Sequence, residues 1–542
     1  MSNYVIYHCH TMLSNGVTNI DSVTSYEDYV KAVSDFGMKA LGFSEHGCVF
    51  EWYKKKQAIE KAGMKYLHGE EFYLTSTLDE KIRDNMHCVL IARNYEGLKE
   101  LNKLSSMAFN RSTNNFYFVP RISFDDLYNT SDNIIVTSAC LAGPINRAEV
   151  GDKSRFISFM KDHRDRCFFE VQHHIDKDQV EYNKLLYVLS KETGVRLIAG
   201  TDTHCLNKEH EEARKILQKS KDIHFDSEDN FNLNLMNYDE LVEAYAKQNS
   251  LPKDVYLAAI DMTNEMSEMV DEYSIDTHTK YPHIYDDPDK AFKEKVNEGY
   301  KENKYVSSRY KLADIKPIIQ NEYEVYKKVG AFDFMLLERY LLEWERKNGI
   351  ERGYGRGSVN GSFIAYLMGI TEMDSIKFDL NFFRFMNPDR VTNADIDVDY
   401  SGKDRDAVKT FLLRDKMGLP QIRTSEIITF NTVKLKGAIK DISRALGIPL
   451  DTAQEISDAV TLDDSHNQVI DDAYRKKYPE LFQYADVITG VVVSIGSHPS
   501  GVLVSDRPID EEVGLCTIKG SEYPVSQLYM KELDDLMYVK LK

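Results

Sequence analysis

The chain has 542 residues, enough for about three or four domains with a core each, and a formal net charge of −19. No apolar run approaches the roughly 20 residues that span a bilayer, no signal-peptide pattern opens the chain, and the seven scattered cysteines include no CxxC pair, so we expect a reducing, cytoplasmic location without a membrane. The acidic charge counts against bulk nucleic-acid binding but leaves room for a local basic face.

Residues 1–205 alternate short apolar stretches with helical ones. The apolar stretches occupy 3–11, 38–47, 133–140, 166–174 and 195–204, and helical patterns cover 22–37 and 178–193. Strands that alternate with helices indicate an α/β layer fold or barrel. We therefore predict an α/β domain over residues 1–205.

Histidines, carboxylates and one cysteine gather where these apolar stretches end. The pair His8 and His10 aims both imidazoles to one side of a strand, and the stretch 202–204 repeats this pattern as DxH. The full set is His8, His10, Glu45, His46, Glu71, His87, Cys140, Asp202 and His204. A lone histidine is usually structural, but this combination predicts a multinuclear zinc, manganese or iron site. We interpret EVQHH at 170–174 as supporting that site or facing a substrate, with a core role as the alternative.

The middle of the chain reads as helical. Charged amphipathic segments lie near 208–221, 237–248, 288–303 and 316–330. Beyond residue 331 the pattern is mixed, with helices expected near 334–348, 358–368, 404–415 and 431–446 and a pair of strands after 486. We predict three domains: 1–205, a helical linker or thumb-like region over 206–330, and a third domain over 331–542.

A glycine-rich loop, GYGRGS at 353–358, precedes an apolar helical stretch. Glycines let a backbone approach a ligand closely, and backbone N–H groups at a helix N-terminus together with Arg356 can cradle a phosphate. No Lys-Ser or Lys-Thr pair follows the glycines, so the loop is not a Walker A motif. Taken alone, a flexible loop is the default interpretation.

Three aspartates alternate with apolar residues in ADIDVDY at 394–400. In an extended strand Asp395, Asp397 and Asp399 would share one face while the residues between them face a core. Like charges so placed favour a divalent cation between them. An EF-hand loop also opens with DxDxD, but its glycine and glutamate positions hold Tyr400 and Asp406 here. A solvated acidic strand end is the other alternative.

A basic helical face is predicted further along. Lys436, Lys440 and Arg444 are spaced i, i+4 and i+8, so they share one side of a helix. Such a stripe is ordinarily only solvated, and phosphate contact is the functional alternative.

The histidine-rich series resembles the PHP (polymerase and histidinol phosphatase) domain at the front of bacterial C-family DNA polymerases, the DNA polymerase III α subunits. The resemblance assigns the nine residues listed above to the family's nine metal-ligand positions, with Glu45 in place of the family's aspartate. It implies a PHP-type (β/α) barrel with a multinuclear Zn²⁺, Mn²⁺ or Fe²⁺ site. Metal-dependent 3′–5′ exonuclease or phosphoesterase chemistry is the implied activity.

The glycine loop and the aspartates resemble the GRGS and PD-x-D-x-DF motifs of the same family, with departures at Phe383, Ala394 and Tyr400. The resemblance implies a polymerase β-like nucleotidyltransferase palm (α+β) with part of the fingers and thumb. Asp395 and Asp397 would hold two Mg²⁺ ions for template-directed nucleotide transfer, with Asp399 in support. The nucleotide or phosphate contacts it implies are Gly355, Arg356, Gly357, Ser358, Arg384, Arg390, Lys436, Lys440, Arg444 and Lys540, with His498 and Gly501 as weaker candidates.

The resemblance covers nearly the whole chain but only about half of an α subunit. Lys540 matches the lysine of the motif that carries the family's third catalytic aspartate, and Lys542 takes the place of that aspartate. We therefore expect a split or truncated polymerase, for example phage-encoded, that is weak or inactive alone. It would act on DNA primer-template and dNTPs with a C-terminal partner chain, reach a sliding clamp through the missing part, and work in the bacterial cytoplasm.

Two other functions stay open from the sequence. One is a stand-alone PHP metallophosphoesterase, against which the joint glycine-loop and aspartate signature speaks. The other is a non-catalytic scaffold half of a split polymerase.

Overall fold

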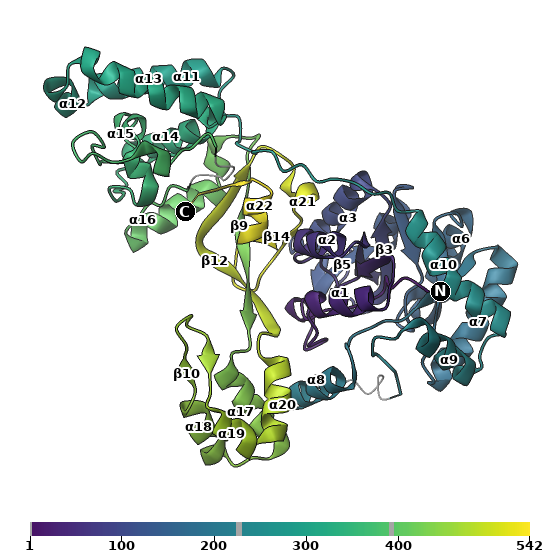
Figure 1. Ribbon diagram of the computed structural model, residues 1–542. Coiled ribbons are helices and arrows are strands. Elements are labelled where there is room, and N and C mark those ends of the chain that lie inside the picture. Colours follow the sequence, from purple (N-terminus) through teal and green to yellow (C-terminus); the bar gives the residue numbers. More distant parts are fainter. Residues whose placement is uncertain (1–2, 224–229, 390–394, 542) are drawn as a thin grey trace. The chain divides into compact units, whose positions relative to one another are not determined.

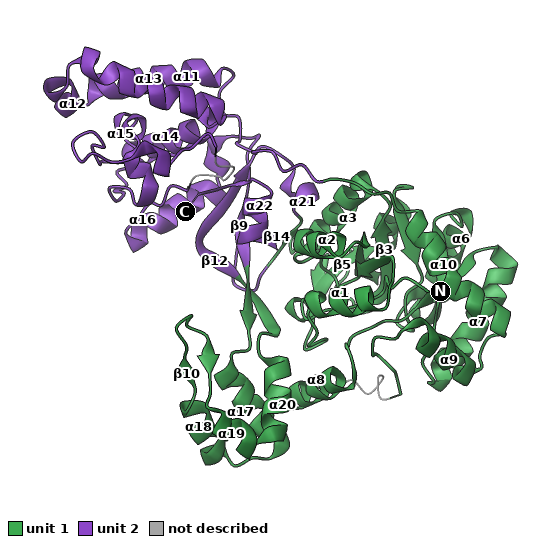
Figure 2. Ribbon diagram, in the orientation of Figure 1, with its two compact units in different colours: residues 1–274, 429–496, 514–517 green, residues 275–428, 497–513, 518–542 purple. Residues whose placement is uncertain are grey.

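The computed structural model describes residues 3–223, 230–389 and 395–541 (Figure 1). The chain divides into two compact units (Figure 2), unit 1 with Met1–Ser274, Thr429–Gly496 and Gly514–Thr517, and unit 2 with Ile275–Ile428, Ser497–Val513 and Ile518–Lys542. The domain boundaries near 205 and 330 stay predictions. Among the described residues, no helix is long and apolar enough to cross a membrane.

Unit 1 is built around a mixed sheet with strand order β4-β5-β2-β3-β6-β7-β8, in which β1 also pairs with β2. The strands are β1 (Ala40–Phe43), β2 (Lys65–Thr75), β3 (Met86–Ala92), β4 (Phe116–Tyr117), β5 (Val119–Ser123), β6 (Ile134–Thr137), β7 (Cys167–Gln172) and β8 (Arg196–Gly200). Burial along β1, β6 and β7 is continuous, because both faces of these strands are covered.

The N-terminal segment closes this sheet into a ring. Ile6 forms a parallel bridge with Leu41 of β1, and Cys9 forms one with Thr203, just after β8. The predicted strand over 3–11 is therefore present only as isolated bridges. Apolar side chains such as Val5, Leu67 and Phe168 belong to one buried cluster of this unit. This arrangement confirms the α/β barrel predicted for the start of the chain.

Helices flank the ring and a helical subdomain completes unit 1. The helices up to residue 268 are α1 (Tyr26–Asp35), α2 (Trp52–Lys61), α3 (Tyr95–Ala108), α4 (Phe124–Tyr128), α5 (Pro144–Arg147), α6 (Val150–Asp162), α7 (Lys177–Thr193), α8 (Lys208–Ser220), α9 (Tyr238–Gln248) and α10 (Lys253–Glu268). The subdomain adds α17 (Leu435–Leu446), α18 (Leu450–Asp458), the hairpin β10 (Thr461–Leu462) and β11 (Gln468–Val469), α19 (Asp472–Lys477) and α20 (Pro479–Ile488). Leu217 of α8 and Ile439 of α17 lie in one buried apolar cluster, so this subdomain shares a core with the earlier helices.

Unit 2 combines helices with a sheet in the order β14-β9-β12-β15. Its helices are α11 (Pro288–Glu302), α12 (Lys304–Arg309), α13 (Leu312–Lys328), α14 (Phe332–Lys347), α15 (Phe363–Leu367), α16 (Gly402–Leu413), α21 (Ile509–Glu512) and α22 (Met530–Asp535). Its strands are β9 (Arg423–Thr432), β12 (Val492–Ser505), β14 (Val525–Tyr529) and β15 (Val539–Leu541), of which β9 and β12 also supply residues to unit 1; the short β13 (Leu515–Cys516) belongs to unit 1. The mixed content agrees with the predicted palm.

Two predicted elements differ in the structure. The strand pair expected after 486 is one long strand, β12, because α20 runs to Ile488 and the chain turns at Gly490, whose φ is +93°. The aspartate segment is extended but not a regular strand, since only Asp397 and Tyr400 form bridges. The predicted alternation holds in part: Ile396 is 2% exposed and Asp395 and Asp399 are exposed, whereas Asp397 and Val398 are both half-buried.

A buried carboxylate, Glu322 of α13, caps the helix that follows the glycine loop. Its two oxygens accept hydrogen bonds from the backbone N–H groups of Phe363 (2.8 Å) and Ile364 (2.9 Å) and from the Ser362 hydroxyl (2.8 Å). Burial raises the pKa of Glu322 to about 7, against these hydrogen bonds, which favour the charged form. The capping group is therefore sensitive to pH near neutrality.

This capping predicts a pH-dependent stability. Because the pKa of Glu322 is raised in the folded chain, that chain binds more protons than the unfolded chain between about pH 4.5 and 7. The stability that protonated Glu322 contributes is therefore fully present below this window and is lost as the pH rises through it. We expect the free energy of unfolding of the wild type, relative to Glu322→Gln, to fall by about 3 kcal/mol between about pH 4.5 and 8 in urea titrations. The exposed Glu294→Gln on α11 should show no such change. A flat or rising difference for Glu322→Gln would contradict the assignment.

Candidate functional site

Most residues of the predicted metal-ligand series meet at one end of the ring in unit 1. His8 and His10 come from the N-terminal segment, and His46 follows β1. Glu71 lies in β2 and His87 in β3, while Asp202 and His204 follow β8. Three groups of their ligand atoms lie within 4.8 Å of one another: His10, Asp21, His46 and His204; His8, His10 and Glu71; and His46, Glu71 and His87.

Glu71 is the hub of this cluster. Its carboxylate oxygens lie 3.3 Å from His8 Nε2, 2.8 Å from His46 Nδ1 and 3.0 Å from His87 Nδ1. Burial would raise the pKa of Glu71, but the surrounding imidazoles, His87 foremost, hold it well below its usual value. Glu71 is therefore an ionised group that only accepts hydrogen bonds, and it lies between His8, His46 and His87.

Asp202 forms a second carboxylate centre beside it. Its Oδ1 lies 3.3 Å from His8 Nε2, 3.2 Å from His10 Nε2 and 3.6 Å from His204 Nδ1. Burial, with His46 and His204 nearby, lowers the pKa of His10 to about 4. His10 is thus neutral near pH 7, which is the protonation state that a metal ligand needs.

Asp21 joins the cluster although the sequence analysis missed it. Its Oδ1 lies 3.5 Å from His46 Nε2 and 3.4 Å from His204 Nε2. The side chain of Asn15 accepts hydrogen bonds from the backbone N–H groups of Asp21 (2.6 Å) and Ser22 (3.1 Å) and so shapes the loop that presents this carboxylate. The signal was available, because Asp21 is the only acidic residue between His8 and Ser25.

Glu45 lies elsewhere and takes no part in the three ligand groups. Its carboxylate accepts hydrogen bonds from the backbone and hydroxyl of Thr11 (2.9 and 2.6 Å) and from Ser14 (2.7 Å), and it forms an ion pair with Lys55 (2.5 Å). These partners occupy the carboxylate, so the geometry favours Asp21 over Glu45 within the cluster, and the ligand role of Glu45 stays a prediction.

Cys140 lies at the edge of the cluster, after β6. Its Sγ is 3.6 Å from His87 Nδ1 and 3.9 Å from Glu71 Oε1. Burial and the nearby Glu71 raise the pKa of this thiol well above its usual value. The predicted cysteine is thus adjacent to the cluster but outside the three groups of tightly spaced ligand atoms.

The buried polar atoms of this cluster fit bound metal ions. His8 Nε2, His10 Nε2, Asp21 Oδ2 and Glu71 Oε2 are buried and have no hydrogen-bond partner in the described part of the chain. Leaving such atoms unpaired in a buried site costs free energy, whereas imidazole and carboxylate are ligands that zinc, manganese and iron accept. The chain therefore carries buried groups that can hold metal ions.

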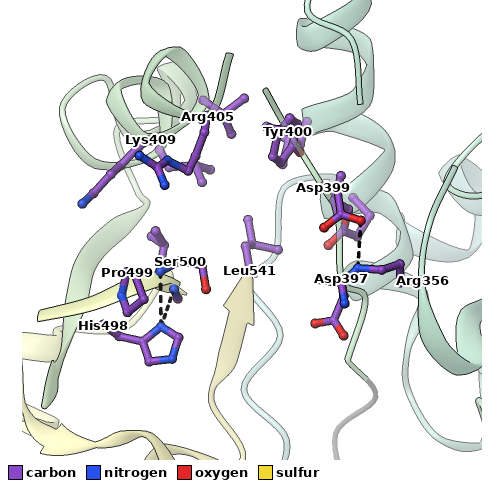
Figure 3. Close-up of a pocket in the computed structure, with 17 residues that line it drawn as sticks. Arg356, Asp397, Asp399, Tyr400, Arg405, Lys409, His498, Pro499, Ser500 and Leu541 are labelled. Carbon is purple, nitrogen blue, oxygen red and sulfur yellow. Dashed lines mark hydrogen bonds and ion pairs between the residues drawn. The ribbon is translucent and has the colours of Figure 1, made fainter. Parts of the chain in front are cut away.

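Unit 2 contains a pocket of about 270 Å³ beside the aspartate segment (Figure 3). Its lining residues are Glu338, Leu341, Arg356, Asp397, Val398, Asp399, Tyr400, Arg405, Val408, Lys409, Leu412, His498, Pro499, Ser500, Gly501, Val502 and Leu541. The predicted Arg356, Asp397 and Asp399, and the weaker candidates His498 and Gly501, are thus brought together. The backbone N–H of Gly501 donates to His498 Nδ1 at 2.9 Å within β12, which fixes the orientation of this imidazole (Figure 3).

The glycine loop and the aspartate segment run antiparallel along this pocket. The backbone N–H of Gly353 donates to the carbonyl of Asp399 (2.8 Å), and that of Arg356 donates to the carbonyl of Asp397 (3.2 Å). Across the ribbon, Arg356 Nε lies 2.9 Å from Asp399 Oδ2 (Figure 3). Gly355 and Gly357 have φ values of +89° and +81°, which glycine adopts without strain. Asp399 is therefore occupied by the predicted phosphate-binding arginine.

Other predicted nucleotide contacts lie outside this pocket. Asp395 and Arg384 are exposed and do not line it, and Arg390 lies outside the described residues. Lys540 is buried on β15, where it donates to Asp534, and Lys542 again lies outside the described residues. The basic face of α17 forms as predicted, with Lys436, Lys440 and Arg444 exposed, but it belongs to unit 1.

Two basic residues that the sequence analysis missed line the pocket. Arg405 and Lys409 lie one turn apart on α16, across the pocket from Asp397 and Asp399 (Figure 3). Lys409 also forms an ion pair with the buried Glu426. The i, i+4 spacing just after the aspartates was the signal that could have found them.

Comparisons with known proteins match two parts of the chain to family models. Residues 7–174 match the model of the PHP domain, and residues 290–542 match that of the bacterial DNA polymerase III alpha NTPase domain. The chain is similar to proteins named DNA polymerase III subunit alpha from Aquifex aeolicus (29% identity, covering 99% of this chain and 51% of the relative), Borreliella burgdorferi (29%, 95% and 46%) and Chlamydia trachomatis (26%, 99% and 49%). It thus spans about half the length of the curated relatives it matches. The chain thus carries a PHP domain followed by a domain of the bacterial DNA polymerase III alpha family.

Proposed function

We propose that this chain is the N-terminal portion of a replicative DNA-directed DNA polymerase that also carries a metal-dependent 3′–5′ exonuclease. The observation that carries the proposal is the buried cluster around Glu71 and Asp202, where histidine nitrogens and carboxylate oxygens from separate parts of the chain converge. Some of these atoms, such as His8 Nε2 and His10 Nε2, make no hydrogen bond within the described chain. A polymerase-type pocket with Arg356 and Asp397 in the same chain favours DNA as the substrate over a small phosphate ester.

In the PHP centre we assign metal binding to His8, His10, Asp21, His46, Glu71, His87, Asp202 and His204, with Cys140 at the edge. Zn²⁺, Mn²⁺ or Fe²⁺ bound there would activate water for attack on a phosphodiester. The histidines would supply nitrogen ligands, and the three carboxylates Asp21, Glu71 and Asp202 would balance the charge of more than one cation. Burial of the cluster keeps its ligands in fixed positions.

In unit 2 we assign Mg²⁺ binding to Asp397, which lines the pocket, together with Asp395, which lies outside its lining, as the motif implies. Bound Mg²⁺ would orient the primer end and the incoming triphosphate. Arg356 and the loop residues Gly355, Gly357 and Ser358 would contact the phosphates, with Arg405 and Lys409 as further cationic contacts. Arg384, Arg390, the basic face of α17 and Lys540 stay predicted contacts, as do a sliding clamp and a partner chain.

A direct test separates the candidate functions. The full chain is reconstituted with Zn²⁺, Mn²⁺ or Fe²⁺ and incubated with 3′- or 5′-labelled single-stranded DNA and, separately, with p-nitrophenyl phosphate. Stepwise shortening from the 3′ end supports the exonuclease. Hydrolysis of the small ester alone would favour a stand-alone phosphoesterase, and neither reaction in a metal-loaded chain would favour the scaffold.

Separate substitutions of the two acids beside the cluster test which of them binds metal. Asp21→Asn should weaken metal binding at least about tenfold, because the carboxylate that lies beside His46 and His204 loses its charge. Glu45→Gln should keep the metal content but lose about 3 to 5 kcal/mol of stability, because Lys55 is left buried without its partner. Metal per chain by plasma mass spectrometry and unfolding in urea measure the two effects. The opposite pattern, with metal lost only in Glu45→Gln, would restore Glu45 as the ligand.

The glycine loop gives a prediction about nucleotide binding. Arg356→Gln should weaken binding of a fluorescent dATP analogue by about tenfold in the presence of Mg²⁺, since one charge-assisted phosphate contact is worth about 1.5 to 3 kcal/mol. Arg414→Gln, on the exposed end of α16 and outside the pocket, is the matched control and should bind as the wild type does. Equal affinity of Arg356→Gln and the control would remove Arg356 from the phosphate site.

A further inference from the structure

A second carboxylate, Glu170 of β7, lies behind His8. Its Oε1 is 2.6 Å from His8 Nδ1, on the edge of the imidazole that faces away from the ligand cluster. The other ring nitrogen, His8 Nε2, lies 3.3 Å from both Glu71 Oε1 and Asp202 Oδ1. Glu170 itself is fully buried and takes part in none of the three ligand groups.

Every other side-chain contact of Glu170 comes from a donor. The hydroxyls of Tyr7 (3.0 Å) and Thr137 (2.9 Å) donate to Oε2, and the side-chain amide of Gln172 (2.8 Å) donates to Oε1. A carboxylate that receives all of these hydrogen bonds acts only as an acceptor. His8 Nδ1 must then be the donor in the 2.6 Å contact, which leaves the lone pair on Nε2, the atom that faces Glu71 and Asp202.

The fold reserves space for this carboxylate. Gly200 of β8 pairs with Gln172 of β7, and a Cβ atom at position 200 would lie 2.1 Å from Glu170 Oε1. Any side chain there would displace Glu170 from His8. The backbone N–H of Glu170 also donates to the Ser138 hydroxyl at 2.9 Å, so both ends of the residue are held.

We propose that Glu170 is a positioning residue that fixes the tautomer and ring orientation of His8 so that Nε2 is directed at a bound metal ion. This proposal rests on the metal centre proposed above. Carboxylates that hold the far nitrogen of a metal-bound imidazole also raise its basicity, and their loss typically weakens metal binding by about 10- to 100-fold. Glu170 therefore acts through His8 without touching the metal.

The test is metal binding by the full chain. Glu170→Gln should weaken binding of Zn²⁺, measured by competition with a chromophoric chelator, by about tenfold or more, and should shift the visible absorption bands of bound Co²⁺. Exposed Glu192→Gln, on α7 of the same unit, is the matched control and should leave both measurements unchanged. Thr137→Val removes one donor to Glu170 while keeping its shape, and should give a smaller change in the same direction if Glu170→Gln fails to fold.

The outcomes distinguish the existence of the metal centre from the role of Glu170. A wild-type chain that binds no Zn²⁺ or Co²⁺ would contradict the metal centre itself. A wild-type chain that binds both metals, while folded Glu170→Gln and Thr137→Val match its affinity and its Co²⁺ spectrum, would overturn the role of Glu170 alone.

Discussion

The burial of carboxylates among histidine side chains at one end of a closed strand ring is the constraint on which unit 1 depends. Glu71 is 1% exposed and its oxygens lie within 3.3 Å of nitrogens of His8, His46 and His87, which come from three different parts of the chain. A buried charge without such partners is strongly destabilising. The strand register must therefore bring these side chains together, and the N-terminal bridges that close the ring also deliver the two histidines of the HxH pair.

In unit 2 buried carboxylates likewise need partners, and here the partner is an arginine of the glycine loop. Arg352, 7% exposed in its side chain, lies 3.2 Å from Glu345 Oε2, and the hydroxyl of Tyr400 donates to the other oxygen of Glu345 at 2.5 Å. Arg352 and Tyr400 also form a backbone bridge. Burial and the neighbouring Glu345 raise the pKa of Glu338 to about 7, against the attraction of Arg352. One arginine thus anchors both the glycine loop and the aspartate segment to α14.

The sequence predicted element types and ligand identities better than it predicted which side chains meet. The HxH and DxH patterns identified four residues that meet in the cluster, because strand ends place such pairs on one side. Glu45 and Asp21 were harder to rank, since a carboxylate beside a strand reveals neither the lysine that neutralises it nor the asparagine that shapes a loop. The alternation around Asp397 predicted the burial of Ile396 and the exposure of Asp395 and Asp399, but not the arginine that pairs with Asp399. Such pairings depend on tertiary contacts between distant segments.

The loop that carries Asp21 is supported from far along the chain. The side-chain amide of Asn15 donates to the carbonyl of Val492 at 2.8 Å, and Ile20 and Val23 share a buried cluster with Ile439 and Ile442 of α17. The match to the PHP model ends at residue 174, yet this loop packs against residues beyond 430. Residues 1–174 alone would therefore lack part of the apolar surface that supports this loop, so the position of Asp21 is coupled to the folding of the helical subdomain around α17.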